Sequence, residues 1–302
     1  KPLAHKLFRD TNDLALGEIP DDDLDGWRSY ENYYFNCLRD VDRNIGTVLD
    51  AVDETGAWDN TIVIFTADHG ELSGAHGLRA KGNVIYRENC EVPLAICHPD
   101  IKTPSVSGVL TSHVDLAPAI LSFAGITEAE RKKQFPALKG HDLSAALGAG
   151  ADRGLGGIGR AGVLYQWDSR IYGSPDGVIE IAKSFKEGGL AKLSGLFEAM
   201  IVEGVKYRHG MRGAYDGRYR FARYFRPTEH NTPQSMDELK RLNDLELYDT
   251  ESDPLERINL ANQPEHEETV WRMAQLVNAL VAQEVGEDTG QMLPGPSMLG
   301  TA

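Results

Sequence analysis

The feature that most constrains the fold is a helical pattern followed at once by a continuous β-branched run. Between residues 27 and 55, apolar side chains recur at spacings of three and four, and Gly56 stands where a helix should end. After a short turn comes the run Thr-Ile-Val-Ile-Phe-Thr at residues 61–66, which is typical of a strand covered on both faces. A helix, a tight turn and a buried strand together predict an α/β sheet.

We expect residues 1–160 to form an α/β core unit. Within it, residues 1–26 and 127–160 lack a clear periodicity and are predicted to be irregular or loop-like. A second apolar run at residues 92–97 predicts another strand, and residues 115–124 predict a helix.

Residues 161–302 are expected to form a smaller α+β unit. Turn-forming residues separate short strand-like runs, which predicts an antiparallel sheet. The amphipathic stretch at residues 265–284 predicts a helix that packs on this sheet, and a Gly- and Pro-rich tail follows it. The predicted strands are residues 163–167, 199–208, 219–225 and 245–248.

The net charge of −15 limits the classes of partner. A nucleic-acid partner would require a basic patch, and none stands out, so we expect no nucleic acid. The acidic balance also argues against an anionic membrane surface. An anionic small molecule stays possible, because a metal ion and a single lysine can reverse the local field.

Three cysteines, Cys37, Cys90 and Cys97, provide no disulfide framework, which favours a reducing compartment and a cytoplasmic location. A periplasmic or secreted location stays open, because the chain begins with Lys1 rather than Met and residues upstream are expected. We expect Cys97 to be a buried cysteine at a strand end. His5 is expected in a flexible terminus.

The strongest candidate site directly follows the buried run. Asp68 and His69 lie beyond the carboxyl end of this strand, where open α/β sheets bind ligands. An adjacent carboxylate and imidazole can both bind one divalent cation if the backbone turns sharply, and Gly70 allows such a turn. On local sequence alone, a polar strand end explains the pair equally well.

Lys81 is the second candidate. A lysine beside a metal ion would neutralise an anionic ester oxygen and stabilise charge in the transition state. The alternative is a solvated surface lysine. His76, between glycines, is interpreted as a loop hydrogen-bonding residue rather than a substrate contact.

Several motifs in order resemble the sulfatase family of the alkaline-phosphatase-like superfamily. The resemblance covers most of residues 27–126 and 199–262, whereas residues 127–198 carry no recognised motif. The motifs are Asp68-His69-Gly70-Glu71, Gly74-Ala75-His76-Gly77-Leu78, Lys81, Val92-Pro93-Leu94, Val114-Asp115-Leu116-Ala117-Pro118, Tyr219-Arg220-Phe221, Glu246-Leu247-Tyr248-Asp249, Asp253-Pro254 with Glu256, and Asn259-Leu260.

This resemblance implies both a fold and a site. The fold would be a partial alkaline-phosphatase-like sheet flanked by helices, followed by a small antiparallel-sheet-plus-helix domain. Asp68 and His69 would be two metal ligands, with calcium the usual ion and manganese or zinc as alternatives. Lys81 would be the catalytic lysine that contacts the sulfate. The spacing is most similar to the choline-sulfatase and phosphonate monoester hydrolase branches.

The family's nucleophile motif, Cys-x-Pro-Ser-Arg, whose cysteine is oxidised to formylglycine, is absent from this sequence. The resemblance therefore implies the C-terminal portion of a sulfatase, inactive alone, whose parent hydrolyses a small anionic sulfate ester. Hydrolysis of phosphonate monoesters or phosphodiesters is one alternative, and a non-catalytic binding module of the same fold is another. A homo-oligomer is left open.

Overall fold

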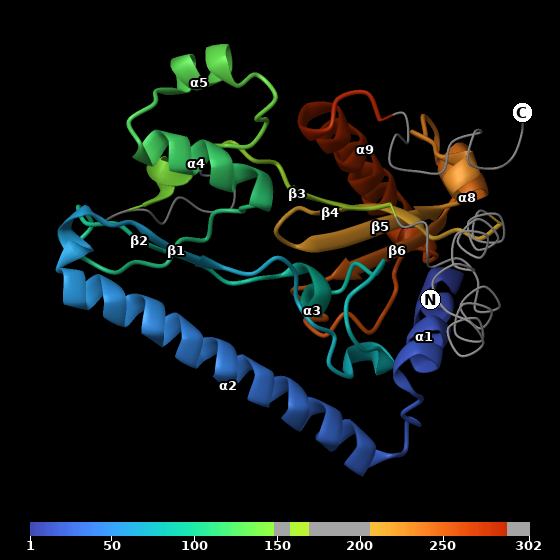
Figure 1. Ribbon diagram of the computed structural model, residues 1–302. Helices are drawn as coiled ribbons and strands as arrows, with labels where there is room; N and C mark the ends of the chain where they lie inside the picture. Colours follow the sequence, from blue (N-terminus) through green and yellow to red (C-terminus); the bar gives the residue numbers. More distant parts are fainter. Residues whose placement is uncertain (148–157, 169–205, 289–302) are drawn as a thin grey trace, which may run out of the picture.

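The computed structural model describes residues 1–147, 158–168 and 206–288 (Figure 1). Its α-helices are α1 (Leu3–Leu16), α2 (Leu24–Thr55), α3 (Arg87–Cys90), α4 (Leu116–Phe123), α5 (Glu128–Gln134), α8 (Met236–Leu242) and α9 (Glu267–Glu284). The strands are β1 (Val63–Thr66), β2 (Leu94–Cys97), β3 (Val163–Trp167), β4 (Gly210–Tyr215), β5 (Tyr219–Phe225) and β6 (Asp244–Asp249). Short 3-10 helices include η2 (Ala75–Gly77), η3 (His113–Asp115), η4 (Leu143–Ala146) and η7 (Pro264–His266).

The C-terminal unit is built on a four-stranded sheet. Strands β3, β4, β5 and β6 lie in this order, and each pairs antiparallel with the next. The predicted strands at residues 163–167, 219–225 and 245–248 are confirmed. The predicted strand at 199–208 lies mostly outside the described residues, and β4 begins after it, at Gly210. The expected antiparallel sheet is therefore present.

Helix α9 covers one face of this sheet, as predicted. Val270, Met273 and Val277 follow the spacing of one helical face, and all three are fully buried. They pack in one cluster with Phe221 of β5 and Leu247 of β6. Burying an aliphatic side chain of this size stabilises a fold by about 1.5–3 kcal/mol, so this face joins the helix firmly to the sheet.

Helix α1 packs on the opposite face, which corrects the expectation of an irregular N-terminus. Ala4 and Phe8 are fully buried in a cluster with residues of the 72–86 loop and of the sheet. Gly82 makes the close approach possible, because a Cβ atom there would lie 2.2 Å from the ring of Phe8. Helix α1 and the 72–86 loop thus contribute to the core beside the sheet. The predicted division at residue 160 stays a prediction.

A buried polar network joins α1 to β5 and β6. His5, which was expected in a flexible terminus, is only 4% exposed. Its Nε2 atom lies 3.0 Å from Glu246 Oε2, and the hydroxyl groups of Tyr224 and Tyr248 donate to the same carboxylate at 2.7 and 2.6 Å. Burial alone would raise the pKa of Glu246, but the charge and hydrogen bond of His5 and the tyrosine hydroxyls hold that pKa below its ordinary value.

Strands β1 and β2 form a separate two-stranded antiparallel ribbon, above which α4 and α5 lie in Figure 1. The predicted strand at 92–97 is confirmed as β2. The expectation that residues 61–66 form a strand covered on both faces is wrong in this structure, since β1 is at most half-buried and Phe65 is 44% exposed. No described layer covers the second face of the ribbon.

Helix α2 extends as a long rod beside the ribbon (Figure 1) and has no buried residue. Its end is as predicted, because Gly56 adopts a left-handed conformation with φ of 63°. Leu38, Val41 and Val48 of its apolar stripe are 44%, 52% and 65% exposed. Among the described residues, no helix is both long and apolar enough to cross a membrane.

Two segments that lie between β2 and β3 in the sequence are helical. The predicted helix at 115–124 is confirmed as α4. The loop expected at 127–160 instead contains α5 and η4. Helix α5 begins with a capping box, in which Thr127 and Glu130 each accept a hydrogen bond from the other's backbone amide. This short-range signal explains why seven residues without an apolar stripe form a helix.

Candidate functional site

The turn after β1 brings the side chains of Asp68 and His69 together. His69 Nε2 lies 3.2 Å from Asp68 Oδ2, while His69 Nδ1 lies 2.8 Å from the carbonyl oxygen of Gly70. With Nδ1 donating to that carbonyl, Nε2 faces the carboxylate as an acceptor. Two electron-pair donors this close repel each other unless a proton or a cation lies between them.

The donor pair fits part of a divalent-cation site. The side chain of Asp68 is 85% exposed and that of His69 is 37% exposed, so further ligands can approach. Among the described residues, no third His, Cys, Asp or Glu forms a metal-binding group with them. Calcium takes six to eight oxygen ligands, so these two residues would hold only a portion of its coordination shell.

Gly70 is required here by close packing. Its amide donates to the carbonyl oxygen of Asn89 at 3.1 Å. A Cβ atom at this position would lie 1.9 Å from the carbonyl oxygen of Glu88. The sequence interpretation expected a glycine that permits a sharp turn, and the structure adds the physical cause, which is the backbone of α3 directly against the turn.

Glu71 organises the following loop, a role that the sequence interpretation missed. Its Oε1 atom accepts hydrogen bonds from the amides of Ser73 and Ala80, at 3.1 and 2.7 Å, and from the hydroxyl of Tyr30, at 3.0 Å. Burial, followed by the Glu71 charge, raises the pKa of Tyr30 to about 12. One carboxylate thus closes the loop and ties it to α2.

Lys81 is exposed at the end of this loop. Its ammonium group has no hydrogen bond or ion pair with any described residue, so it is available to an anion. The preceding residue, Ala80, has a φ of 60°, and the following Gly82 is packed against Phe8. The position of the backbone is therefore well defined, whereas the catalytic role of Lys81 stays a prediction.

His113 and Asp115 lie in η3, directly before α4, and support the site from there. His113 Nε2 lies 2.8 Å from the carbonyl oxygen of Ala67, directly before the candidate metal pair. Asp115 is fully buried, accepts from the amides of Ser112 and His141 at 2.8 and 2.7 Å, and forms an ion pair with Arg160. Asp115 therefore stabilises the fold around the site, and its carboxylate is already occupied.

A second group of donors lies beneath the loop. One ligand atom each of His76, Glu88 and Glu256 lie within 4.8 Å of one another. The sequence interpretation treated His76 as a loop hydrogen-bonding residue, but its ring stacks on Tyr86 with centroids 3.4 Å apart. Glu88 and Glu256 were not predicted as site residues, because 168 positions separate them in the sequence.

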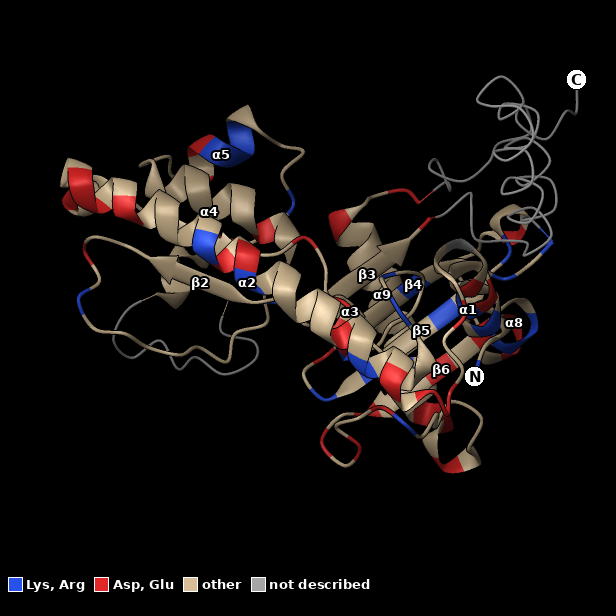
Figure 2. Ribbon diagram, turned by 60° about the horizontal axis from the view of Figure 1, so that its bottom comes forward, with Lys and Arg blue, Asp and Glu red and all other residues tan. Residues whose placement is uncertain are grey.

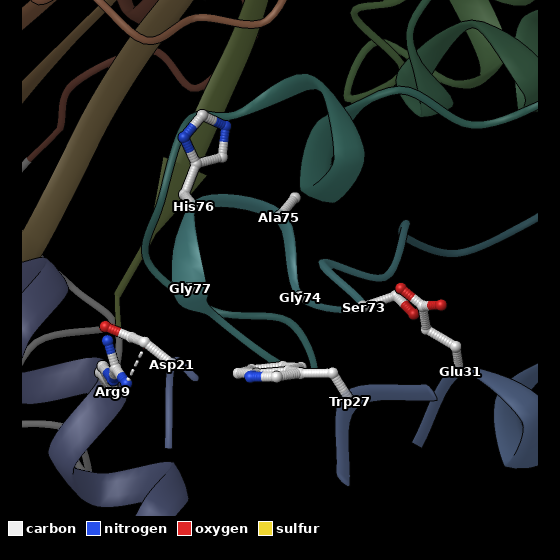
Figure 3. Close-up of a pocket in the computed structure, with 9 residues that line it drawn as sticks. All are labelled: Arg9, Asp21, Trp27, Glu31, Ser73, Gly74, Ala75, His76 and Gly77. Atoms are coloured by element: carbon white, nitrogen blue, oxygen red, sulfur yellow. Dashed lines mark hydrogen bonds and ion pairs between the residues drawn. The ribbon is translucent and has the colours of Figure 1, made fainter. Parts of the chain in front are cut away.

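A hollow of about 500 Å³ lies on the other side of the loop (Figure 3). Trp27, Glu31 and the segment 73–77 line it, together with the ion pair of Arg9 and Asp21, whose atoms lie 2.6 Å apart. Because Arg9 is paired, the lining residues offer no free guanidinium to an anionic substrate. We assign no ligand to this hollow.

Charged residues are dispersed over the described part of the chain. Figure 2 shows Lys and Arg spread over several elements, with Asp and Glu along α2 and in many loops. The expected absence of nucleic-acid and membrane partners stays a prediction.

All three cysteines are free. Cys97 is exposed, which corrects the expectation of a buried cysteine, because the face of β2 that carries it is not covered by a described layer. Cys90 is the more enclosed one, and burial raises the pKa of its thiol to about 12.

Similarity to known proteins runs through both sequence and fold. Residues 8–126 match the family model described as Sulfatase. The chain is 37% identical over 114 residues to the N-acetylglucosamine-6-O-sulfatase of Bacteroides thetaiotaomicron, in an alignment that covers 36% of this chain and 20% of the relative. It is 33% identical over 94 residues to the choline-sulfatase of Rhizobium meliloti, covering 31% of this chain and 18% of the relative.

The fold is similar to that of the phosphonate monoester hydrolase of Agrobacterium radiobacter, with a TM-score of 0.55 and 22% sequence identity. This match covers 83% of the present chain and 41% of the other. At this identity the similarity is one of fold. The chain matches about a fifth of the length of the two curated relatives above and less than half of this solved structure.

Proposed function

We propose that this chain, whose residues 8–126 belong to the sulfatase family, is part of an enzyme that hydrolyses sulfate esters. The observation that carries the proposal is the 3.2 Å contact between Asp68 Oδ2 and His69 Nε2, inside the matched segment and at an exposed strand end. Such a pair of donors is suited to a divalent cation, which can stabilise negative charge on an anionic ester.

The proposed substrate is a small anionic sulfate ester. Asp68 and His69 would hold a divalent cation, with calcium preferred and manganese or zinc as alternatives. The bound cation would supply positive charge to an ester oxygen. Lys81, which has no counterion among the described residues, would bind the sulfate and stabilise the negative charge that develops during hydrolysis.

The remaining catalytic groups would come from residues outside this chain. The sequence contains no Cys-x-Pro-Ser-Arg motif, so the formylglycine nucleophile would not lie here. Asp68 and His69 also provide only two metal ligands. We therefore propose that residues 1–302 alone do not hydrolyse sulfate esters, and that activity belongs to the whole protein.

The test compares variants of the whole protein on an aryl sulfate. Lys81→Ala should lower kcat/KM by about 10²–10³, the usual effect of removing one donor that stabilises a developing anion. Asp68→Asn and His69→Asn should lower the metal content as well as the activity. Lys102→Ala is the matched control, because Lys102 is an exposed lysine on another loop. Equal activity of Lys81→Ala and Lys102→Ala would contradict the proposed role.

The second candidate is hydrolysis of phosphonate monoesters or phosphodiesters. It is favoured by the fold similarity to a phosphonate monoester hydrolase. Sulfate and phosphate esters share a tetrahedral anionic centre, so the same residues would serve either reaction. Parallel measurement of kcat/KM on matched aryl sulfate, phosphonate and phosphodiester substrates separates the two candidates. Activity on none of them would favour a non-catalytic module.

A further inference from the structure

The donors beneath the loop come from three distant segments. His76 lies in η2, Glu88 in α3, and Glu256 in the turn after β6, so only the tertiary fold brings them together. The side chain of Glu256 is fully buried, that of His76 is 7% exposed, and that of Glu88 is 29% exposed. A metal ion held here would be shielded from water on most sides.

The carboxylate of Glu88 has one oxygen atom that accepts no hydrogen bond from a described residue. Its Oε2 atom is buried and has no hydrogen-bond partner among the described residues. The nearest candidate is His76 Nε2, at 3.8 Å, which is within ion-pair distance when His76 is protonated but is longer than a hydrogen bond. Leaving a buried acceptor unsatisfied costs about 1–3 kcal/mol. A cation between the imidazole nitrogen and the carboxylate oxygen would satisfy both atoms.

The other two donors are already oriented. The ring of His76 lies parallel to Tyr86, with an angle of 6° between the planes. Glu256 accepts a hydrogen bond of 2.8 Å from the amide of Arg87 and forms an ion pair with Arg220. Partners of this kind fix metal ligands before the ion arrives. His76 also lines the hollow, but in Figure 3 its ring points away from Arg9, Asp21 and Trp27.

We propose that His76, Glu88 and Glu256 form a binding site for a divalent transition-metal ion of the zinc type, separate from the pair Asp68 and His69. An imidazole nitrogen with two carboxylate oxygens suits the tetrahedral coordination of zinc. Zinc bonds to such atoms are about 2.0–2.2 Å long. Ligand atoms that lie up to 4.8 Å apart therefore move closer together when the ion binds.

The test is calorimetric titration of residues 1–302 with zinc chloride after removal of bound metal by a chelator. We expect saturable binding that weakens at least about 10-fold in His76→Asn and in Glu88→Gln. Asparagine suits position 76, because it tolerates the left-handed backbone found there, with φ of 58°. Cobalt(II), which gives visible absorption bands that report its ligands, should show altered bands in His76→Asn.

The matched control is the double variant Asp68→Asn and His69→Asn, which should retain the binding. Far-UV circular dichroism checks that each variant is folded. If His76→Asn is unfolded, Glu88→Gln still tests the site, because glutamine keeps the shape of the glutamate side chain. The proposal is overturned by an absence of zinc binding, by equal affinity in folded Glu88→Gln, or by loss of this binding in the double variant. Affinity is measured without substrate, so the result is independent of the proposed ester hydrolysis.

Discussion

Replacing His5 with alanine tests whether the buried network described above holds the N-terminal helix on the sheet. His5 is 4% exposed and Glu246 is fully buried, with 3.0 Å between their interacting atoms. The contact is an ion pair when His5 is protonated, and removing one partner of a buried ion pair costs about 3–5 kcal/mol, because the other charge is left uncompensated. The tyrosine hydroxyls still donate to Glu246 in the variant, so we expect the lower end, about 3 kcal/mol.

The assay is urea denaturation followed by far-UV circular dichroism. In thermal unfolding, the same loss should lower Tm by about 6–12 °C, at about 2–4 °C per kcal/mol for a chain of this size. Lys6→Ala is the matched control on the same helix. Lys6 forms an exposed ion pair with Asp10, so its removal should cost at most about 1 kcal/mol.

The effect of His5→Ala also depends on pH. The pKa of Glu246 is lowered in the folded state, so its contribution to stability is present above the ordinary carboxyl pKa of about 4.3 and is lost as the pH falls below it. The stability difference between wild type and His5→Ala should therefore shrink from pH 7 to pH 3. A loss no larger than that of Lys6→Ala at pH 7, or a difference independent of pH, would refute the reasoning.

Three further predictions concern the site and the exposed helix. Gly70→Ala should destabilise the chain by about 1–3 kcal/mol in urea, because its Cβ atom would lie 1.9 Å from the Glu88 carbonyl oxygen; an unchanged midpoint would mean that α3 moves freely. Asp115→Asn should cost about 3 kcal/mol, because Arg160 loses a buried counterion, and a loss under about 0.5 kcal/mol would argue against it. We expect residues 1–302 to self-associate through the exposed apolar stripe of α2, where Val48 is 65% exposed, so Val48→Glu should elute later than wild type in size-exclusion chromatography; equal elution of the two would contradict this expectation.

The site could be anticipated to the extent that its residues are neighbours in sequence. Asp68 and His69 are adjacent, so a single turn brings their side chains together. The function of Glu71 was hidden, because its partners include Tyr30, 41 positions away. The Glu71 carboxylate resembles any polar residue of a loop until the loop is folded around it.

Some elements were missed because tertiary contacts outweigh local preference. Helix α1 has no recognisable cap, and Pro2 stands at its N-cap without a side-chain hydrogen bond. Its stability comes from Ala4 and Phe8 against the sheet, and the sequence does not reveal that surface. Conversely, the apolar run of β1 predicted a strand with both faces covered by other elements, but the strand is at most half-buried among the described residues.

Local spacing by itself determined α2, β5 and α9, because the helical and strand periods decide which neighbouring side chains share a face. Tertiary structure alone decided the pairing of His5 with Glu246 and the meeting of His76, Glu88 and Glu256. These groups are separated by up to 241 positions, and their distances depend on how α1, the loop and the sheet pack. Side-chain packing in the core determines those distances, and the spacing of neighbouring residues in the sequence does not predict how the core packs.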